Sequence, residues 1–257
     1  MQRRPYRQER LEAIARQLQE AGYVSVGELS DSLGVSAVTI RSDLESLERS
    51  GLLVRTHGGA VPMHLGEGAL SFSVRQRSQV QAKARIGAAA AELVTDGLAI
   101  VLDASTTAWH MARCLMSRRD LTVVTTGLYV ALELLRAPGI SVIMPGGAIW
   151  REAASIVGTS GMSTIGNGNL QQGFFGGRGL TVEDGLTDAY APEVDLKREL
   201  AHAVREVNAI VDASKLGKVA FACCAPLSDI RRVFTDRAAS PEIVAALRDH
   251  GVQVIMV

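Results

Sequence analysis

Small, hydroxyl-bearing and charged residues follow several apolar runs in the second half of the chain. Three of these segments are rich in hydroxyls or glycine: Asp103-Ala104-Ser105-Thr106-Thr107, Thr125-Thr126-Gly127 and Pro145-Gly146-Gly147. Two more carry a cation, Gly176-Gly177-Arg178-Gly179 and Asp212-Ala213-Ser214-Lys215. Small residues let backbone N–H groups approach an anion, and the start of a following helix favours negative charge there. The chemistry that these segments indicate is the binding of a phosphorylated polyol.

Each of these features also has a purely structural explanation. Hydroxyls at 105–107 are typical of a helix cap, and Gly146-Gly147 is typical of a turn. Lys215 fits an exposed lysine, and Glu193 with Lys197 has the spacing of an ordinary surface pair on a helix. Ligand binding is favoured because all of them are expected at one edge of one sheet.

The elements that must position these residues alternate between strand and helix. Strand-like apolar runs lie at 98–102, 121–124, 140–144, 173–175, 209–211 and 233–234, with helical stretches at 107–116, 129–135 and 194–204. This alternation predicts an α/β domain with a mainly parallel sheet covered by helices on both faces. In such sheets ligands bind beyond the carboxyl ends of the strands, where the segments above lie.

The first sixty residues follow a different pattern, helical and then briefly β. Apolar residues at helix spacing, Leu11 to Leu18, precede Ser25, which has Glu28 three residues on and so predicts a capped second helix. After Gly34-Val35, Ser36 is expected to cap a third helix with Ile40, Leu44 and Leu47 on one face. A strand at 52–56 and a turn at Gly58-Gly59 complete a winged helix-turn-helix.

The outer face of the third helix suits DNA. With the apolar face inward, Ala37, Val38, Arg41 and Ser42 are expected to point outward near the helix start, where such residues enter the major groove. The alternative is a solvated helix face. The 27 basic residues balance 27 acidic ones, but the first sixteen residues are basic, and phosphate contacts need only a local basic face.

Consecutive motifs in this half resemble the N-terminal domain of DeoR-type bacterial transcriptional regulators. They are Arg7-Gln8-Glu9-Arg10-Leu11, Gly22-Tyr23-Val24-Ser25-Val26, Glu28-Leu29, Leu33-Gly34-Val35-Ser36, Val38-Thr39-Ile40-Arg41, Asp43-Leu44 and Arg55-Thr56-His57-Gly58-Gly59-Ala60. One departure is Ser42, where the family usually has a second Arg, so a phosphate or base contact is expected to be missing there. The residues expected to contact DNA are Ser36, Val38, Thr39, Arg41, Ser42, Arg55 and His57.

The second half resembles the sensor domain of the same family, which is similar in fold to ribose-5-phosphate isomerase. The resemblance rests on 83–107, 121–126, Pro145-Gly146-Gly147, Val157-Gly158, Gly185-Leu186-Thr187-Asp188, Glu193 with Lys197-Arg198, and Asp212-Ala213-Ser214-Lys215. It implies a phosphosugar effector, with Ser105 to Thr107 and Lys215 near the phosphate, Asp103 and Gly146-Gly147 nearer the sugar, and Asp212 orienting the Lys215 loop. The expected effector-binding residues are Asp103, Ser105, Thr106, Thr107, Thr125, Gly146, Gly147, Arg178, Glu193, Lys197 and Lys215.

These patterns divide the chain into a DNA-binding domain at 1–61, a linker at 62–74 and a sensor domain at 75–257. The basic N-terminus has no apolar stretch after it, and three cysteines with one adjacent pair make a poor disulfide framework. We therefore expect a cytoplasmic repressor of sugar or polyol catabolism genes, without membrane, metal or cofactor. A homo-dimer or homo-tetramer is expected because paired recognition helices read paired half-sites.

The main rival is a phosphosugar isomerase with an accessory DNA-binding domain. Aldose–ketose isomerisation needs a base, and Glu193 has a suitable position. The segment expected beside it reads Gly176-Gly177-Arg178-Gly179, where the isomerase fold and many relatives carry an Asp. Because that carboxylate is replaced by Arg178, the sequence favours a sensor over an enzyme. A pure protein-interaction module explains neither the winged helix nor the anion-friendly strand ends.

Overall fold

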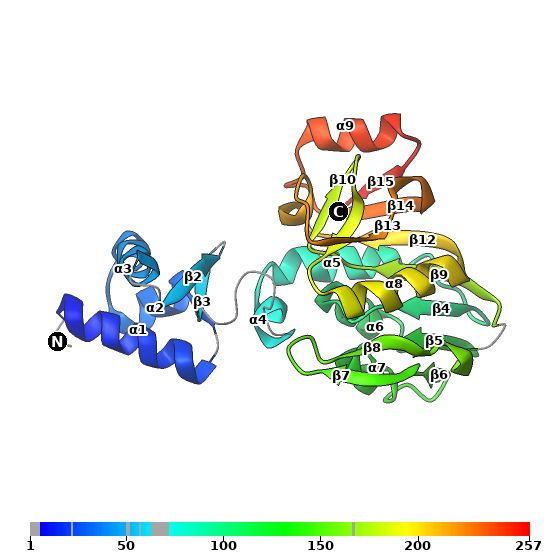
Figure 1. The fold of residues 1–257 in the computed structure, drawn as a ribbon, viewed down its shortest axis with the longest axis horizontal. Coiled ribbons are helices and arrows are strands. Elements are labelled where there is room, and N and C mark those ends of the chain that lie inside the picture. Colours follow the sequence, from blue (N-terminus) through cyan, green and yellow to red (C-terminus); the bar gives the residue numbers. More distant parts are fainter. Residues whose placement is uncertain (1–5, 22, 50–51, 57, 63–71, 166–167) are drawn as a thin grey trace. The chain divides into compact units, whose positions relative to one another are not determined.

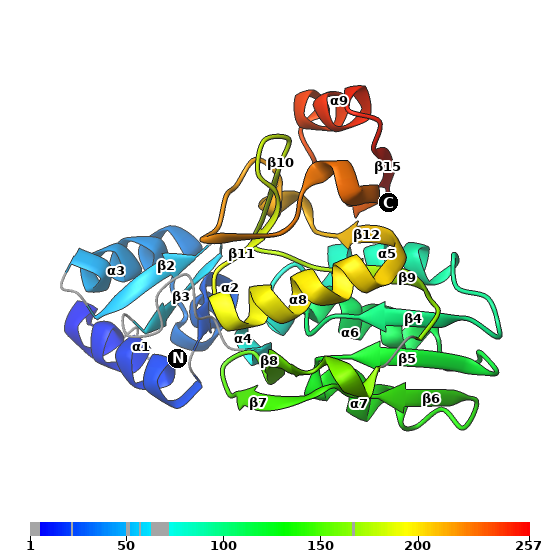
Figure 2. The same ribbon diagram turned by 45° about the vertical axis from the view of Figure 1, so that its right-hand side comes forward.

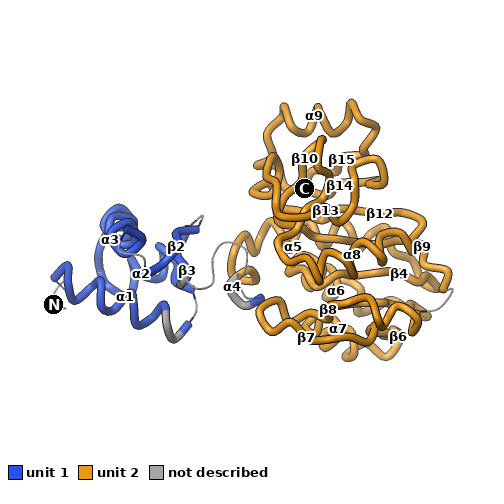
Figure 3. The backbone as a smooth tube through the Cα atoms, viewed as in Figure 1, with its two compact units in different colours: residues 1–74 blue, residues 75–257 orange. Residues whose placement is uncertain are grey.

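In a computed structural model the chain forms two compact units, Met1–Val74 and Arg75–Val257 (Figure 3). The structure describes residues 6–21, 23–49, 52–56, 58–62, 72–165 and 168–257. Both ends of the segment predicted as a linker, 62–74, belong to regular elements. Pro62 closes strand β3 (Gly59–Pro62), and the last three residues begin helix α4 (Phe72–Arg77).

The first unit is a winged helix-turn-helix, as the sequence predicts. Its elements are α1 (Arg7–Ala21), β1 (Val24–Ser25), α2 (Val26–Leu33), α3 (Ala37–Arg49), β2 (Leu53–Thr56) and β3, the strands pairing antiparallel in the order β1-β3-β2 (Figure 1). The three helices and β2 enclose one apolar core that includes Ile14, Leu29, Ile40, Leu44 and Leu53. Residues from every element meet there, so this core fixes α3 against the wing.

Side-chain caps define the turn between α2 and α3. Ser25 Oγ accepts the N–H of Glu28 at 3.1 Å and donates to Glu28 Oε2 at 3.0 Å, which starts α2. Gly34 ends α2 in the left-handed region, with φ +64°. Ser36 Oγ then accepts the N–H of Thr39 at 3.2 Å and starts α3.

A buried ion pair joins α1 to α3. Asp43 is 1% exposed, and its two oxygens accept Arg10 Nε at 2.7 Å and Arg10 Nη2 at 3.2 Å. Two parallel charge-assisted hydrogen bonds fix orientation as well as distance. Asp43 is therefore buried and holds the third helix in place.

The second unit is built on a seven-stranded parallel sheet. Its order is β15-β14-β12-β9-β4-β5-β6, from strands β4 (Ala99–Leu102), β5 (Leu121–Thr125), β6 (Ile140–Ile143), β9 (Leu170–Phe175), β12 (Val204–Ile210), β14 (Ile230–Thr235) and β15 (Gln253–Met256). The helices are α4, α5 (Val80–Ala91), α6 (Thr106–Cys114), α7 (Leu128–Leu134), α8 (Ala191–Ala203) and α9 (Pro241–Asp249). Six strands were predicted, and β15 was missed.

Helices cover both faces of this sheet, which confirms the predicted architecture. One apolar cluster packs α5, α6 and α7 against alternate strand residues such as Ile100 and Phe174. A second packs α8 and α9 against their neighbours, such as Val101 and Phe175. Figure 2 shows α8 running across the front of the sheet. Strands buried on both faces read as continuous apolar runs, which is why the sequence reveals them.

Two smaller β elements were not predicted. Strands β10 (Gly179–Thr181), β11 (Gly185–Asp188) and β13 (Ala222–Ala225) form an antiparallel sheet, and β7 (Gly146–Trp150) pairs with β8 (Ser155–Gly161) as a hairpin. The predicted turn at Gly146-Gly147 is therefore wrong, because both glycines lie in β7. A Cβ on Gly161 would lie 2.0 Å from the oxygen of Gly146, so this end of the hairpin requires glycine. None of the helices within the described ranges is long and apolar enough to cross a membrane.

Candidate DNA-binding and effector sites

The start of α3 exposes most of the residues predicted to contact DNA. Ser36, Arg41 and Ser42 are exposed, and Val38 is 72% exposed although it is apolar. Thr39 is half-buried, with its Oγ1 2.9 Å from Ser36 Oγ. Ala37 packs against the core, because it lies on the same side of the first turn as Ile40, so its expected outward position is wrong.

The wing residue Arg55 is tied to α3. Its backbone N–H donates to Glu48 Oε1 at 2.9 Å, and its Nε lies 3.7 Å from Glu48 Oε2. The Arg55 side chain remains 43% exposed, which leaves it accessible to a phosphate. His57, the other predicted wing residue, lies outside the described residues.

Asp103 joins the ends of two neighbouring strands, β4 and β9. It is 1% exposed; Oδ1 accepts the N–H of Ser105 at 3.0 Å and Oδ2 accepts the N–H of Gly176 at 2.8 Å. A Cβ on Gly176 would lie 2.5 Å from Ser105 Cβ, so only glycine allows this approach. Asp103 therefore shapes the carboxyl edge of the sheet, where the sequence predicted the effector.

Lys197 is also committed to this edge. Its Nζ lies 2.8 Å from Asp188 Oδ2 and 3.1 Å from Asp103 Oδ2, and it donates to the carbonyl of Gly176 at 3.0 Å. Burial alone would lower the pKa of Lys197, but Asp188 and Asp103 hold that pKa well above its usual value. The alternative of an exposed pair with Glu193 is wrong, because both side chains are buried and Lys197 contacts these two aspartates.

Hydroxyls line the ends of β4 and β5. Ser105 Oγ caps α6 by accepting the N–H of Ala108 at 3.0 Å, while Thr106 and Thr107 are buried in its first turn. Thr125 is buried, and its Oγ1 accepts the N–H of Gly127 at 3.1 Å. Ser105 is therefore a helix cap, as the structural explanation held. The helix that it caps, α6, has its positive N-terminal end at this edge of the sheet. Gly146 and Gly147, predicted beside them, are exposed on β7.

Arg178 and Lys215 bring positive charge to the same edge. Arg178 Nε lies 3.7 Å from Asp188 Oδ1, and its side chain is 16% exposed, so it does not point into solvent. Burial and the nearby Arg75 lower the pKa of Arg178 to about 10. Lys215 ends a 3₁₀ turn (Ala213–Lys215). The carboxylate of Asp212 accepts the N–H of Ser214 in this turn at 3.1 Å, which is what a residue that orients the loop would do. Burial lowers the pKa of Lys215. The negative charge of Asp212 opposes this shift, and the positive charge of Arg178 adds to it.

Lys83, which is 5% exposed on α5, was not among the residues predicted for the site. Its Nζ donates to the carbonyls of Arg75 and Ser78 at 2.6 and 2.7 Å. Burial lowers the pKa of Lys83 to about 7; Asp212 opposes this, while Lys215 adds to it. Lys83 opens a segment that resembles the family, but a single lysine in an alanine-rich helix gave no sign of burial.

Glu193 lies in the first turn of α8 and is 9% exposed. Burial raises the pKa of its carboxyl, Lys197 opposes the shift, and Asp188 adds to it.

An aromatic pair that the sequence did not suggest connects the β7–β8 hairpin to the start of α8. The rings of Trp150 and Tyr190 lie 4.1 Å apart between centroids. Within the described residues, no group of three or more His, Cys, Asp or Glu is placed to hold a metal ion.

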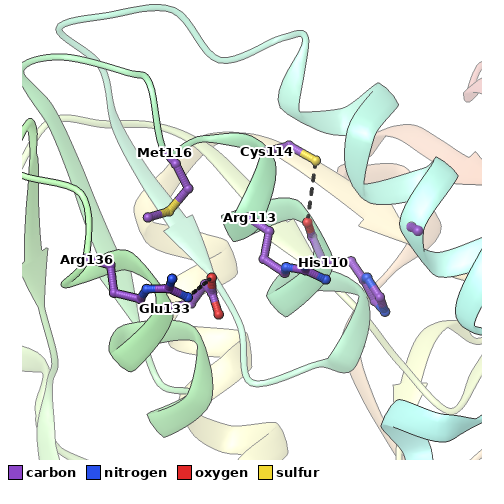
Figure 4. Close-up of a pocket in the computed structure, with 7 residues that line it drawn as sticks. His110, Arg113, Cys114, Met116, Glu133 and Arg136 are labelled. Carbon is purple, nitrogen blue, oxygen red and sulfur yellow. Dashed lines mark hydrogen bonds and ion pairs between the residues drawn. The ribbon is translucent and has the colours of Figure 1, made fainter.

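A pocket of about 430 Å³ lies elsewhere, between α5, α6 and α7 (Figure 4). It is lined by Ala84, His110, Arg113, Cys114, Met116, Glu133 and Arg136. Figure 4 shows Arg136 paired with Glu133 at 3.2 Å and Cys114 Sγ facing the His110 carbonyl at 3.6 Å. None of these residues belongs to the predicted effector set, so the case for an effector site rests on the strand ends.

A winged helix-turn-helix followed by an α/β unit whose strand ends carry buried charged groups is the arrangement expected of a transcriptional regulator with a sensor domain. The comparisons agree: residues 10–64 match the model of the DeoR-like helix-turn-helix domain, and residues 78–237 match that of the DeoR C terminal sensor domain. The chain belongs to the DeoR family. This is a family of DNA-binding regulators rather than of enzymes.

Relatives match along nearly the whole chain. The HTH-type transcriptional regulator GolR of Listeria innocua is 36% identical over 96% of this chain and 97% of its own. The glycerol-3-phosphate regulon repressor of Escherichia coli is 30% identical over 96% and 97%, and a putative aga operon transcriptional repressor of Escherichia coli O157:H7 is 31% identical over 97% and 93%. Among solved structures, ribose 5-phosphate isomerase A of Methanocaldococcus jannaschii is similar with a TM-score of 0.42, at 17% identity over 54% of this chain and 55% of that one.

Proposed function

We propose that the chain is a repressor of sugar or polyol catabolism genes whose operator binding is controlled by a phosphorylated sugar. The observation that carries the ligand class is the carboxyl edge of the sheet, where Arg178 and Lys215 lie with the capped start of α6. Cations together with a helix N-terminus favour an anion, and a phosphate has the charge and the acceptors to engage both. The names of relatives as repressors, one of them of a glycerol-3-phosphate regulon, support the proposal.

Within this proposal the effector contacts come from two groups of residues, and Lys197 supports them. We assign the phosphate contacts to Ser105, Thr106, Thr107, Thr125, Arg178 and Lys215. The residues nearer the sugar are Asp103, Glu193 and the exposed Gly146 and Gly147. Lys197 holds Asp103 and Asp188 in place, because its ammonium already contacts both. Its role toward the effector is then one of positioning.

The DNA-binding proposal concerns the first unit. The start of α3 contacts base edges or phosphates through Ser36, Val38, Thr39, Arg41 and Ser42. The wing contacts DNA through Arg55 and His57. We propose a homo-dimer or homo-tetramer, because paired recognition helices read paired half-sites. We place it in the cytoplasm, where it has access to chromosomal DNA. We assign the DNA-binding role to residues 1–61, the connecting role to 62–74 and the sensing role to 75–257.

A thermal-shift screen tests the effector class. Phosphorylated sugars and polyols are compared with the same compounds without phosphate, because a ligand that binds only the folded state raises the melting temperature. The expected result is a rise of several degrees with at least one phosphorylated compound and none with its unphosphorylated partner. Equal shifts within each pair, or no shift with any phosphorylated compound, would contradict a phosphate-based effector.

A further inference from the structure

Val38 is an apolar side chain on the outer face of α3, where it is 72% exposed. The other exposed residues of this helix are polar and follow Val38 at intervals that keep them on the same face: Arg41, Ser42, Glu45 and Arg49. The opposite face is packed into the core of the unit. Val38 is therefore the apolar member of a face that is otherwise polar, and it lies in the first turn of the helix.

The other side chains at the start of α3 have structural roles. Ser36 Oγ accepts the N–H of Thr39 at 3.2 Å and lies 2.9 Å from Thr39 Oγ1, so both hydroxyls take part in the cap. Ala37 packs against the core. Val38 belongs to neither the cap nor the core, and it is the first-turn side chain that projects outward.

The stability of the unit does not account for a valine at this position. A valine that is 72% exposed gains little from burial, and a β-branched residue has a lower helix propensity than alanine. Leu52 is another exposed apolar residue of the same unit, at 56%, but it lies after the end of α3. What distinguishes Val38 is its place in the third helix of a DeoR-like helix-turn-helix domain, because the N-terminal residues of a recognition helix lie against base edges in the major groove.

The chemistry of valine restricts what it can recognise there. Its side chain has no hydrogen-bond donor or acceptor, so it cannot read the polar pattern of a base pair. The apolar group that base pairs present in the major groove is the 5-methyl group of thymine. A β-branched side chain has one strongly preferred rotamer in a helix, so the two methyl groups of Val38 meet the groove in a fixed position.

We propose that Val38 contacts the 5-methyl group of a thymine in each operator half-site and thereby determines the preference for thymine at that position. This inference rests on the proposed role of α3 in DNA binding. It adds the kind of base that the first turn of the helix selects. The contact removes apolar surface of both groups from water, which favours thymine over a base without the methyl group.

The test uses the full chain and begins with selection of its preferred sequences from a pool of random DNA duplexes. Each thymine of the selected half-site is then replaced in turn by uracil, which pairs identically but lacks the methyl group, and affinity is measured by gel shift. At one thymine this replacement should weaken binding of the unmodified protein about three- to tenfold. In Val38→Ala the same replacement should have little effect, because the contact is already lost.

Leu52→Ala is the matched control, since it also shortens an exposed apolar side chain of the same unit, and it should keep the full effect of uracil. Urea unfolding checks that both variants keep the fold, as expected at exposed positions. An equal effect of uracil on Val38→Ala and on the unmodified protein at every thymine would overturn the role of Val38. So would the absence of any effect on the unmodified protein. If the unmodified protein enriches no sequence from the pool, operator binding fails, and the proposed function fails with it.

Discussion

Lys197 Nζ lies 3.1 Å from Asp103 Oδ2, although the two residues are 94 positions apart in the sequence and on different elements. Asp188 Oδ2 lies on the same ammonium at 2.8 Å, so one cation neutralises two buried carboxylates. Because each charge is almost fully withdrawn from water, the group is stable only as a complete set.

Replacing Lys197 by Met should therefore destabilise the protein strongly. Removing one partner of a buried ion pair costs about 3–5 kcal/mol, since the remaining charge has no compensation. Urea unfolding at neutral pH measures the change in the free energy of unfolding. Lys218→Met, at an exposed position, is the control and should change it little. A loss below about 1 kcal/mol for Lys197→Met would contradict the buried pairing.

Arg41→Ala and Arg55→Ala should each weaken operator binding. Removing a residue that reads a base costs about 1–3 kcal/mol of binding free energy. Removing one that contacts phosphate makes the affinity depend less steeply on salt concentration. Gel-shift titration at two salt concentrations separates the two cases. Arg49→Ala, at the far end of α3, serves as the control. If affinity and salt slope stay unchanged in both variants, α3 and the wing do not bind DNA as proposed.

Lys215→Ala should keep the fold and operator binding but lose the response to the phosphosugar. The charge-assisted contacts to phosphate provide the differential affinity that a switch requires, and this variant removes them. Operator binding is titrated with the effector found in the thermal-shift screen, and Lys218→Ala is the matched exposed control. A response of unchanged potency in Lys215→Ala would make Lys215 a bystander.

Lys83 predicts a specific pH dependence of stability. Burial lowers its pKa from 10.5 to about 7, so between these values the unfolded chain binds more protons than the folded one. Stability from this residue therefore rises with pH across that window, by up to about 1.4 kcal/mol per pH unit. Lys83→Met should lose this rise while keeping contributions from other groups. Urea unfolding of both proteins from about pH 7 to 9 gives the two slopes, and parallel curves would contradict a neutralised Lys83.

The sensor unit should lack isomerase activity. Arg178 stands where a carboxylate is expected beside the substrate, and a guanidinium has no hydrogen-bond acceptor and does not act as a base. The structure places Arg178 3.7 Å from Asp188, where it serves ionic pairing. Ribose 5-phosphate and other aldose phosphates are incubated with the protein and assayed for the ketose. Turnover above the uncatalysed rate that is lost in Glu193→Gln would show an enzyme instead.

The parts of the fold that the sequence predicts well are those with a clear local pattern. The capped helices around Gly34 and the doubly buried strands such as 98–102 follow from periodicity and apolar runs alone. The hairpin at 146–161 was missed because its glycines also suit a turn, and only the pairing of Gly146 with Gly161 distinguishes the two. The last strand was missed because a short apolar run at 252–257 has no local feature that specifies a partner.

The candidate site divides in the same way. That residues 103–107 and 212–215 lie at one edge follows from the rule for parallel sheets. The partners of Lys197 do not follow from it, because Asp188 belongs to a small antiparallel sheet whose pairing no local pattern indicates. Burial of Lys83 and its contact with the carbonyl of Arg75 also depend on how α4 and α5 pack, which no spacing within those helices reveals.

The order of the two units along the chain also sets the order in which they are synthesised. Every residue of the winged helix has been made by position 62, whereas the last cation of the effector edge, Lys215, is added more than 150 residues later. Domains generally fold as units, the N-terminal one first, as the chain leaves the ribosome. Each new molecule therefore acquires its DNA-reading half before it has any means of sensing the metabolite. The ability to respond to an effector is gained after the ability to bind DNA.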